Sequence, residues 1–335
     1  MRERIRGCLL GGAIGDALGA PIEFQSLAEI RRIHGENGVE SFVWHDSGRL
    51  GVVTDDTQMT LFTVEGILRA AGDVPASVFA AHRRWYATQI LPFPSRGRID
   101  LPVGDVLLDG GLGDEAWLYA RRAPGNACLS GLRSGRRATL DEPANPDSKG
   151  CGAVMRSAPF GLVPAWTPGE AFALASECGA QTHGHPSGHL AAGALAALTR
   201  LLLDGLTLEE AVNVALGLLA TRPGHEETAG ALRRALEAPR DKPSAELLET
   251  LGAGWIAEEA LAMSVYCALA HPGSVRDALL LAVNHSGDSD STGAITGNLL
   301  GTALGESALP RAWADAVEGA ATTVRLADEL AALEA

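Results

Sequence analysis

Residues 7–19 read Gly7-Cys-Leu-Leu-Gly-Gly-Ala-Ile-Gly-Asp-Ala-Leu-Gly19, and residues 293–305 read Gly293-Ala-Ile-Thr-Gly-Asn-Leu-Leu-Gly-Thr-Ala-Leu-Gly305. In each stretch a glycine returns every fourth residue, which on a helix forms a stripe along one face. Glycine inside a helix costs about 1 kcal/mol relative to alanine, so both stripes need a compensating contact. We predict that the two helices pack closely on each other or on a shared neighbour. The alternative is two independent, flexible helices.

Much of the remaining chain also has helical periodicity. Apolar residues recur at spacings of three and four over residues 57–69, 76–87, 187–203, 208–220, 257–270 and 275–283. Thr167, Thr207 and Ser274 each stand three residues before an acid, as at a capped helix start. Sustained two-residue alternation is absent, although residues 39–44 and 51–54 are candidates for short extended pieces. The pattern predicts an all-α fold.

Two long segments lack this periodicity. Residues 91–113 and 123–152 are rich in glycine, proline and short polar residues, which favour loops. Long connections inside a compact domain are usually functional. We therefore predict that residues 1–335 form one domain, a compact orthogonal helical bundle in which the two loops frame a cleft. A flexible linker between two domains is the alternative.

The composition is that of a folded, acidic protein. Hydrophobic residues make up 46% of the 335 positions, charged residues 20%, and the net charge is −14. These values exclude a disordered chain and argue against general binding to nucleic acid or to anionic membranes. The five scattered cysteines fit a reducing compartment. Asp16 interrupts the apolar run near the N-terminus and Arg200 interrupts the longest one, so we expect neither a secretory signal nor a membrane span, and a monomeric, cytoplasmic protein.

Two clusters of acids stand immediately before predicted helices. They read Thr54-Asp-Asp-Thr57 and Asp288-Ser-Asp-Ser-Thr292. One acid or hydroxyl suffices to cap a helix, and four converging carboxylates would repel one another without a cation. An all-oxygen ligand set suits Mg²⁺ or Mn²⁺. An EF-hand loop is excluded because Leu299 stands where its bidentate glutamate belongs. Ordinary helix capping is the alternative to a metal site.

Five motifs occur together in this order. They are Gly11-Gly-Ala-Ile-Gly-Asp-Ala-Leu-Gly-Ala-Pro-Ile-Glu23, Thr54-Asp-Asp-Thr57, Gly150-Cys-Gly-Ala-Val-Met-Arg156, Gln181-Thr-His183 and Gly287-Asp-Ser-Asp-Ser-Thr292. With this order and spacing the chain resembles the ADP-ribosylglycohydrolase family, over residues 7 to about 305. The resemblance implies a compact all-α domain with a cleft that holds a binuclear centre of two Mg²⁺ ions, or of Mn²⁺. The metal ligands that it implies are Thr54, Asp55, Asp56, Asp288, Asp290 and Ser291.

The same resemblance implies roles for other residues. Glu23 would transfer the proton beside the scissile bond, while Asp55 and Asp56 would hold metal and nucleophile as catalytic residues. The implied substrate-binding residues are Ser148, Gly150, Cys151, Gly152, Ala153, Met155, His183 and Gly287. Of these, Met155 is interpreted first as core packing.

Three positions depart from the family pattern. Ser291 stands where several members have threonine, which resembles the arginine-specific branch. Cys151 replaces an asparagine of some members, so a hydrogen bond from that side chain is not assumed. Asp100 only loosely matches an Asp-Ile-Gly segment of relatives, and we assign it no catalytic role.

The sequence therefore predicts a Mg²⁺-dependent hydrolase. Its reaction would cleave the N-glycosidic bond between ADP-ribose and a modified protein side chain, with arginine as the first choice. One alternative is hydrolysis of O-linked ADP-ribose, as on serine, acetate or nucleic acid ends. Another is a non-catalytic binding or structural member of the family, which the presence of Glu23 and all four aspartates disfavours.

Overall fold

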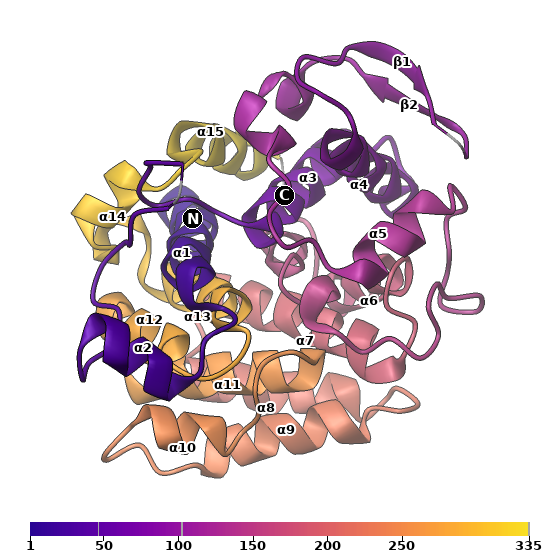
Figure 1. The fold of residues 1–335 in the computed structure, drawn as a ribbon. Helices are drawn as coiled ribbons and strands as arrows, with labels where there is room; N and C mark the ends of the chain where they lie inside the picture. Colours follow the sequence, from indigo (N-terminus) through magenta and orange to yellow (C-terminus); the bar gives the residue numbers. More distant parts are fainter. Residues whose placement is uncertain (46, 102, 334–335) are drawn as a thin grey trace.

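The computed structural model describes residues 1–45, 47–101 and 103–333. These residues form an all-α fold around one hydrophobic core, as the sequence predicts (Figure 1). The helices are α1 (Arg2–Gly19), α2 (Leu27–His34), α3 (Asp55–Leu68), α4 (Val74–Ile90), α5 (Asn126–Arg133), α6 (Pro168–Ala180), α7 (Pro186–Leu203), α8 (Leu208–Leu219), α9 (Glu226–Glu237), α10 (Ala245–Glu249), α11 (Ala257–Ala270), α12 (Val275–Val283), α13 (Ser289–Leu304), α14 (Arg311–Ala316) and α15 (Ala320–Ala331). The strands β1 (Gly97–Asp100) and β2 (Asp105–Leu108) form a hairpin.

The two glycine helices, α1 and α13, pack against each other at the centre of the molecule (Figure 1). A Cβ added at Gly11 would lie 2.4 Å from the carbonyl oxygen of Gly297, and one at Gly297 would lie 2.0 Å from that of Gly11. Gly7 meets Gly301 and Gly15 meets Gly293 in the same way. The predicted close packing is confirmed, and the alternative of two independent helices is wrong.

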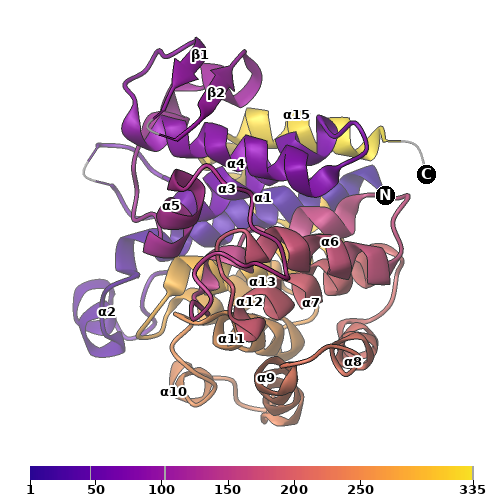
Figure 2. The ribbon, with the colours of Figure 1, turned by 90° about the vertical axis from the view of Figure 1, so that its right-hand side faces the viewer.

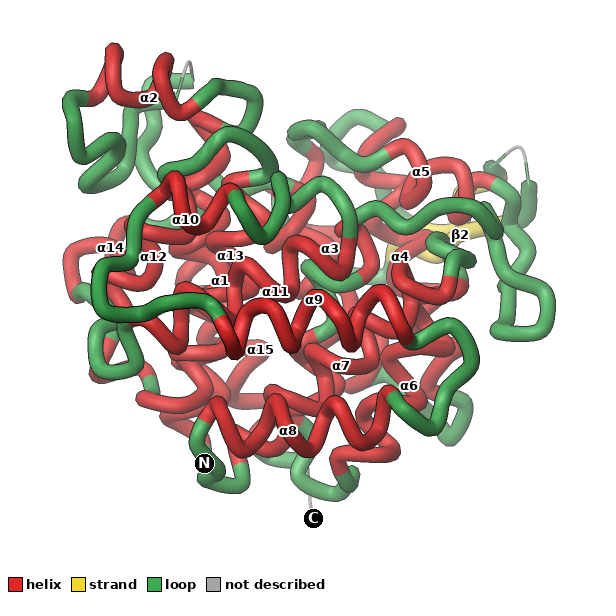
Figure 3. Tube along the Cα trace, turned by 90° about the horizontal axis from the view of Figure 1, so that it is seen from below, coloured by secondary structure: helices red, strands yellow, loops and turns green. Residues whose placement is uncertain are grey.

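The other helices surround this pair. Helices α7, α11 and α12 contact α13, whereas α3 and α15 contact α1, and α4 lies against α3 (Figure 2). Helices α8, α9 and α10 cover the lower side, where Figure 3 shows α8 and α9 nearest the viewer. Within the described residues, none of the helices combines the length and the apolar character that crossing a membrane requires.

The predicted helix starts are confirmed. Thr167 and Thr207 each form a reciprocal capping box with the glutamate three residues later, at the starts of α6 and α8. Ser274 caps α12 by accepting a hydrogen bond from the backbone N–H of Asp277. Each cap satisfies an N–H group that has no partner inside its helix. The helix boundaries therefore follow local sequence chemistry.

The position of extended structure is predicted wrongly. The described residues of 39–44 and 51–54 form no strand, whereas β1 and β2 lie inside the segment 91–113 that the sequence predicts as a loop. The hairpin is stabilised by residues that lie outside it, because Arg83 donates to the carbonyl of Gly104 and Arg84 to that of Leu107. Both arginines extend from α4, so a tertiary contact rather than local alternation selects this hairpin.

Two further expectations need correction. Adjacent arginines are usually solvated, which predicts exposed positions for Arg83-Arg84 and Arg121-Arg122. Arg121 is exposed, but Arg83 and Arg84 are buried, and Arg122 donates to the carbonyl of Val53 and pairs with Glu318. Arg84 and Arg122 donate to carbonyls and carboxylates of other segments, whereas Nε of Arg83 has no hydrogen-bond partner among the described residues. The predicted loop 123–152 contains α5, whose residues Cys128 and Leu132 are buried four positions apart.

The packing of α1 on α13 generates a stability prediction. We expect Gly297→Ala to lower the free energy of unfolding by about 1–3 kcal/mol or more, because its methyl group overlaps the backbone of Gly11. Gly217→Ala is the matched control, since Gly217 lies inside α8 with nothing within 4 Å of an added Cβ. The control should be neutral or stabilising by up to about 1 kcal/mol. Denaturant titration of both variants measures the difference, and equal stabilities would contradict the packing argument.

Candidate active site

The contact between α1 and α13 determines where Glu23 lies. A Cβ at Gly19, the last residue of α1, would lie 2.3 Å from the carbonyl oxygen of Ser289, so the end of α1 abuts the start of α13. A 3₁₀ turn over Ala20–Ile22 then extends α1 by one turn and is followed by Glu23. Gly19 and Pro21 favour a turn after the helix, so the sequence predicts Glu23 on a loop at a cleft mouth rather than in the interior. This is wrong in part, because Glu23 is only 8% exposed, although it does line a cavity.

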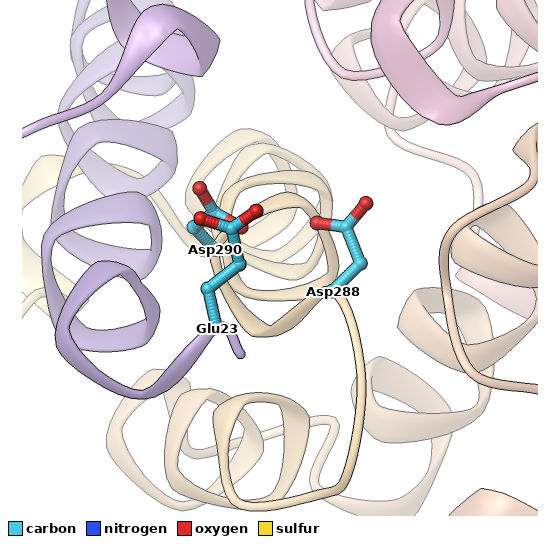
Figure 4. A group of neighbouring side chains, drawn as sticks. All are labelled: Glu23, Asp288 and Asp290. Atoms are coloured by element: carbon cyan, nitrogen blue, oxygen red, sulfur yellow. The ribbon is translucent and has the colours of Figure 1, made fainter. Parts of the chain in front are cut away.

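Three carboxylates converge at this point. One oxygen each of Glu23, Asp288 and Asp290 lie within 4.8 Å of one another. Figure 4 shows Glu23 and Asp290 side by side and Asp288 across from them. All three side chains are buried. Residues more than 260 positions apart are therefore brought together by the packing of two helices.

The second predicted acid pair approaches the same place from α3. Thr54 caps this helix by accepting a hydrogen bond from the backbone N–H of Asp56 at 3.2 Å, and Asp55 and Asp56 form the first turn. Both aspartates are buried, and both line the same cavity as Asp288. The two acid clusters singled out in the sequence therefore form one site.

Burial and mutual repulsion dominate the electrostatics of this site. Burial, followed by the charges of Asp288 and Asp55, raises the pKa of Glu23 to about 8. Burial also raises the pKa values of Asp55, Asp56 and Asp290 well above the usual range, and neighbouring aspartates raise them further. Without a counter-charge, these groups cannot all be ionised at neutral pH.

A fully buried carboxylate, Asp16, anchors the start of α3. Its side chain accepts hydrogen bonds from the backbone N–H of Thr54 at 3.0 Å, from that of Thr57 at 3.0 Å and from the Thr57 hydroxyl at 2.5 Å. Asp16 lies on α1, so it ties the first acid pair to the glycine helix. In the sequence, Asp16 stands out only as an interruption of an apolar run. A lone acid inside an otherwise buried helix is the signal that could have identified it.

The donor atoms at the site fit a hard divalent cation. Asp56 Oδ2 is buried and has no hydrogen-bond partner among the described residues. The Ser291 hydroxyl lies 3.6 Å from Cys151 Sγ and 3.9 Å from Met155 Sδ, and such weak contacts leave its oxygen lone pairs available. Carboxylate and hydroxyl oxygens are the ligands that Mg²⁺ and Mn²⁺ prefer. A bound cation would also offset the repulsion among the acids.

These side chains surround a cavity of about 230 Å³. The sequence-predicted residues that line it are Glu23, Asp55, Asp56, Ser148, Gly150, Cys151, Gly152, Met155, His183, Asp288, Asp290 and Ser291. The sequence also assigns Thr54, Ala153 and Gly287 to the site, but among the described residues these three do not line the cavity. Ala153 is fully buried, and Gly287 has its backbone pressed against Ala253 with a φ of 142°.

The remaining wall of the cavity comes from residues that the sequence analysis does not identify. They are Ala123, Gly125, Asn126, Ala127 and Trp255. Trp255 reaches the site because its carbonyl accepts a hydrogen bond from the backbone N–H of Cys151. The sequence around Trp255 contains no pattern that predicts this long-range contact. Asp100, at the exposed end of β1, does not line the described cavity.

Comparison with known proteins identifies the family. A family model described as ADP-ribosylglycohydrolase matches residues 1–335. The chain belongs to the ADP-ribosylglycohydrolase family. The resemblance drawn from the five motifs is thereby confirmed, and this ADP-ribosylglycohydrolase is an enzyme of the class that hydrolyses glycosidic bonds to ADP-ribose.

Named relatives span nearly the whole glycohydrolase. It is 25% identical over 315 residues to the ADP-ribosyl-(dinitrogen reductase) glycohydrolase of Rhodospirillum rubrum, covering 93% of this chain and 90% of that one. It is 26% identical over 332 residues to the ADP-ribosylarginine hydrolase Tri1 of Pseudomonas putida, covering 98% and 78%. A solved structure titled ADP-ribosylglycohydrolase-related protein complex superposes with a TM-score of 0.69 at 24% identity, over 99% and 98% of the two chains, and supports the fold.

The anchoring role of Asp16 generates the second prediction. Asp16→Asn replaces one acceptor oxygen with an N–H donor that faces other donors, so we expect the glycohydrolase to lose about 1–3 kcal/mol of unfolding free energy. Asp277→Asn makes the same chemical change at an exposed position in the first turn of α12 and should stay within about 0.5 kcal/mol of the wild type. Denaturant titration compares them. An Asp16→Asn protein as stable as the control would show that Asp16 does not hold α3.

Proposed function

We propose that this glycohydrolase removes ADP-ribose from a modified protein side chain with the help of two bound divalent cations, and that arginine is the preferred acceptor. The observation that carries the proposal is the convergence of Glu23, Asp288 and Asp290 in one buried cavity together with the acids of α3. The relatives named as acting on ADP-ribosylated dinitrogen reductase and on ADP-ribosylarginine support the choice of substrate.

The residues that would hold the cations are Thr54, Asp55, Asp56, Asp288, Asp290 and Ser291. Mg²⁺ or Mn²⁺ bound there would supply Lewis acidity, which lowers the pKa of coordinated water and orients ribose oxygens. The chain itself contributes a preformed set of oxygen donors. Asp16 holds the first turn of α3, and Asp288 caps α13 by accepting from the backbone N–H of Ser291 at 3.3 Å. The donors therefore lie on helix termini rather than on free loops, which favours precise placement.

Glu23 is the proposed proton-transfer residue. Burial is the largest of the causes that raise the pKa of its carboxyl group, and burial acts whether or not cations are bound, so the group is suited to hold a proton that a leaving group requires. A glycosidic bond breaks through an oxocarbenium-like transition state, in which an acid protonates the departing atom and a base guides water to the anomeric carbon. Glu23 is well placed for this exchange because it faces Asp288 and Asp290 in the cavity.

The loop from Ser148 to Met155 is the proposed binding surface for the diphosphate and its ribose. Gly150 and Gly152 line the cavity, and their missing side chains allow close approach of a ligand to the backbone. A diphosphate entering a protein of net charge −14 needs local compensation. Backbone N–H groups of the loop, together with bound cations, would provide it.

The choice of acceptor has a direct test. Wild-type protein is incubated with arginine-linked, serine-linked and nucleic-acid-linked ADP-ribose, with Mg²⁺ or with EDTA, and released ADP-ribose is measured. We expect rapid release from arginine that EDTA abolishes. Faster release from serine or nucleic acid would transfer the proposal to O-linked substrates, and release that is insensitive to EDTA would contradict the metal.

Glu23→Gln generates the third prediction. We expect turnover to fall by about 10²-fold or more, the usual contribution of a general acid or base, because glutamine cannot exchange the proton. Mg²⁺ binding, measured by calorimetry, should persist. The exposed Glu36 provides the control, and Glu36→Gln should keep wild-type turnover. A Glu23→Gln enzyme that turns over normally would exclude proton transfer, and one that loses Mg²⁺ would make Glu23 a ligand instead.

Asp290→Asn generates the fourth prediction. The variant should bind Mg²⁺ weakly and nearly lose turnover, whereas its metal-free form should melt no lower than the wild type, because one of several repelling carboxylates is gone.

In the wild type, ADP-ribose should raise the melting temperature more with Mg²⁺ than with EDTA, as ligands sharing one native site require. This difference should vanish in Asp290→Asn and persist in Asp277→Asn. An equal ADP-ribose shift with and without EDTA in the wild type would refute a shared site.

A further inference from the structure

A second cleft lies between α4 and the β hairpin, which Figure 1 shows at the edge of the molecule. We call it the hairpin cleft, and the residues that matter below are Phe79, Ala80, Arg83, Gly104, Val106 and Gly135. It has a volume of about 410 Å³ and shares no lining residue with the carboxylate cavity. A cleft of this size, with an apolar wall and a few polar groups, is typical of a site for a small organic molecule.

Three arginines line the hairpin cleft, and two of them have acidic partners. Arg69 and Arg84 each pair with Glu65 and with Asp109. Two cations thus share two carboxylates, and their charges balance. Asp105, the other described acid that lines the cleft, pairs at 2.7 Å with an exposed arginine of β1. The third arginine, Arg83, is left over from these pairs.

Arg83 is a buried cation that has no carboxylate partner in the described part of the chain. It is 6% exposed, its Nη2 donates to the carbonyl of Gly104 at 2.6 Å, and its Nε is buried with no partner among the described residues. Burial lowers the pKa of Arg83, but a guanidinium group stays charged at neutral pH. Burying an unpaired charge costs free energy, which an anion bound in the cleft would offset.

Two glycines border the guanidinium group of Arg83. A Cβ added at Gly135 would lie 2.5 Å from Nη1, and one at Gly104 would lie 3.9 Å from the same atom. Both glycines line the cleft, and their φ angles of 66° and 71° belong to the left-handed region that favours glycine. The charged end of Arg83 therefore lies at the wall of the cleft, beside two residues that have no side chain to cover it.

We propose that the hairpin cleft binds a small organic oxyanion, whose charged group pairs with Arg83 and whose apolar body lies against Phe79, Ala80 and Val106. Carboxylates and phosphate monoesters share this chemistry, and the planar N–H donors of a guanidinium match both. The net charge of −14 repels anions in general, so binding here depends on the local positive charge. An inorganic ion would leave the apolar wall in water, whereas an organic body would bury it.

The first test compares probes on the wild-type protein by calorimetry. The probes are benzoate, phenyl phosphate, inorganic phosphate and the neutral benzamide. We expect benzoate or phenyl phosphate to bind about tenfold or more tightly than benzamide, because only the anions pair with Arg83, and the tighter of the two identifies the charged group. Benzamide that binds as tightly as both anions would overturn the pairing. Inorganic phosphate that binds as tightly as phenyl phosphate and benzoate would overturn the organic body.

The second test removes the charge of Arg83. Arg83→Met should weaken binding of the tighter probe about tenfold or more, the effect of a lost hydrogen bond between charged groups. Arg325→Met is the matched control, since it removes the same charge from an exposed position on α15 and should keep the wild-type affinity. Unchanged affinity in Arg83→Met, or equal weakening in both variants, would overturn the proposal.

Arg83→Met also removes the hydrogen bond to Gly104, so a third test leaves Arg83 in place. Ala80 is exposed on α4, three residues before Arg83, and residues at this spacing are neighbours on one face of a helix. Ala80→Glu would supply a tethered carboxylate for Arg83 and should weaken binding of the probe about tenfold or more. Ala80→Gln has nearly the same size without the charge and should weaken binding much less. Equal affinities of these two variants would show that the probe does not pair with Arg83.

Discussion

The backbones of two helices can touch only where both lack side chains, and the site depends on this constraint. Gly11 and Gly297 lie so close that a single added Cβ would overlap the opposite carbonyl. The contact continues to Gly19, which meets the first residue of α13, and so the end of one helix meets the start of the other. Sliding α1 by one helical turn would move Glu23 by about 5.4 Å, more than the 4.8 Å that spans the three converging carboxylates.

This rigid frame allows an arrangement of acids that is unfavourable by itself. Asp55, Asp56 and Asp290 belong to the first turns of α3 and α13, where helix dipoles favour negative charge. The dipoles contribute at most about 2 kcal/mol each, which cannot offset several buried carboxylates. The remaining repulsion is the physical reason for proposing a divalent cation at this site, since a cation would offset it. Asp16 is consistent with this, because it orients α3 by accepting hydrogen bonds from the backbone N–H groups of Thr54 and Thr57 rather than by binding the side chains of the acids.

The sequence predicts the central helix pair and the acids better than it predicts the other residues that line the cavity. Glycine spacing, capping residues and the two acid clusters are local patterns whose physical reason lies within a few residues, and they predict the central helix pair and the aspartates of the cavity. Glu23, His183 and the loop from Ser148 to Met155 are identified only through the family resemblance. The hairpin 97–108 depends on Arg83 and Arg84, and Trp255 depends on the backbone of Cys151. Such contacts join segments that are far apart in the sequence, so no periodic pattern of residues predicts them. Asp16 is an intermediate case, since a buried acid in an apolar helix is visible in the sequence but its partner is not.

The same division separates the chemistry of the site from its selectivity. The acids are buried on helix ends, whereas the outer rim near Glu23 consists of loop residues, including Phe24, 75% exposed, and Trp255, 41% exposed. Their rings stack at 5.6 Å between centroids and join the segment after Glu23 to the loop beside Asp288. Exposed residues of this kind can change without disturbing the glycine contact, because they make no part of it. A family built on such a frame is expected to retain its acids and to vary the acceptor through substitutions at the rim.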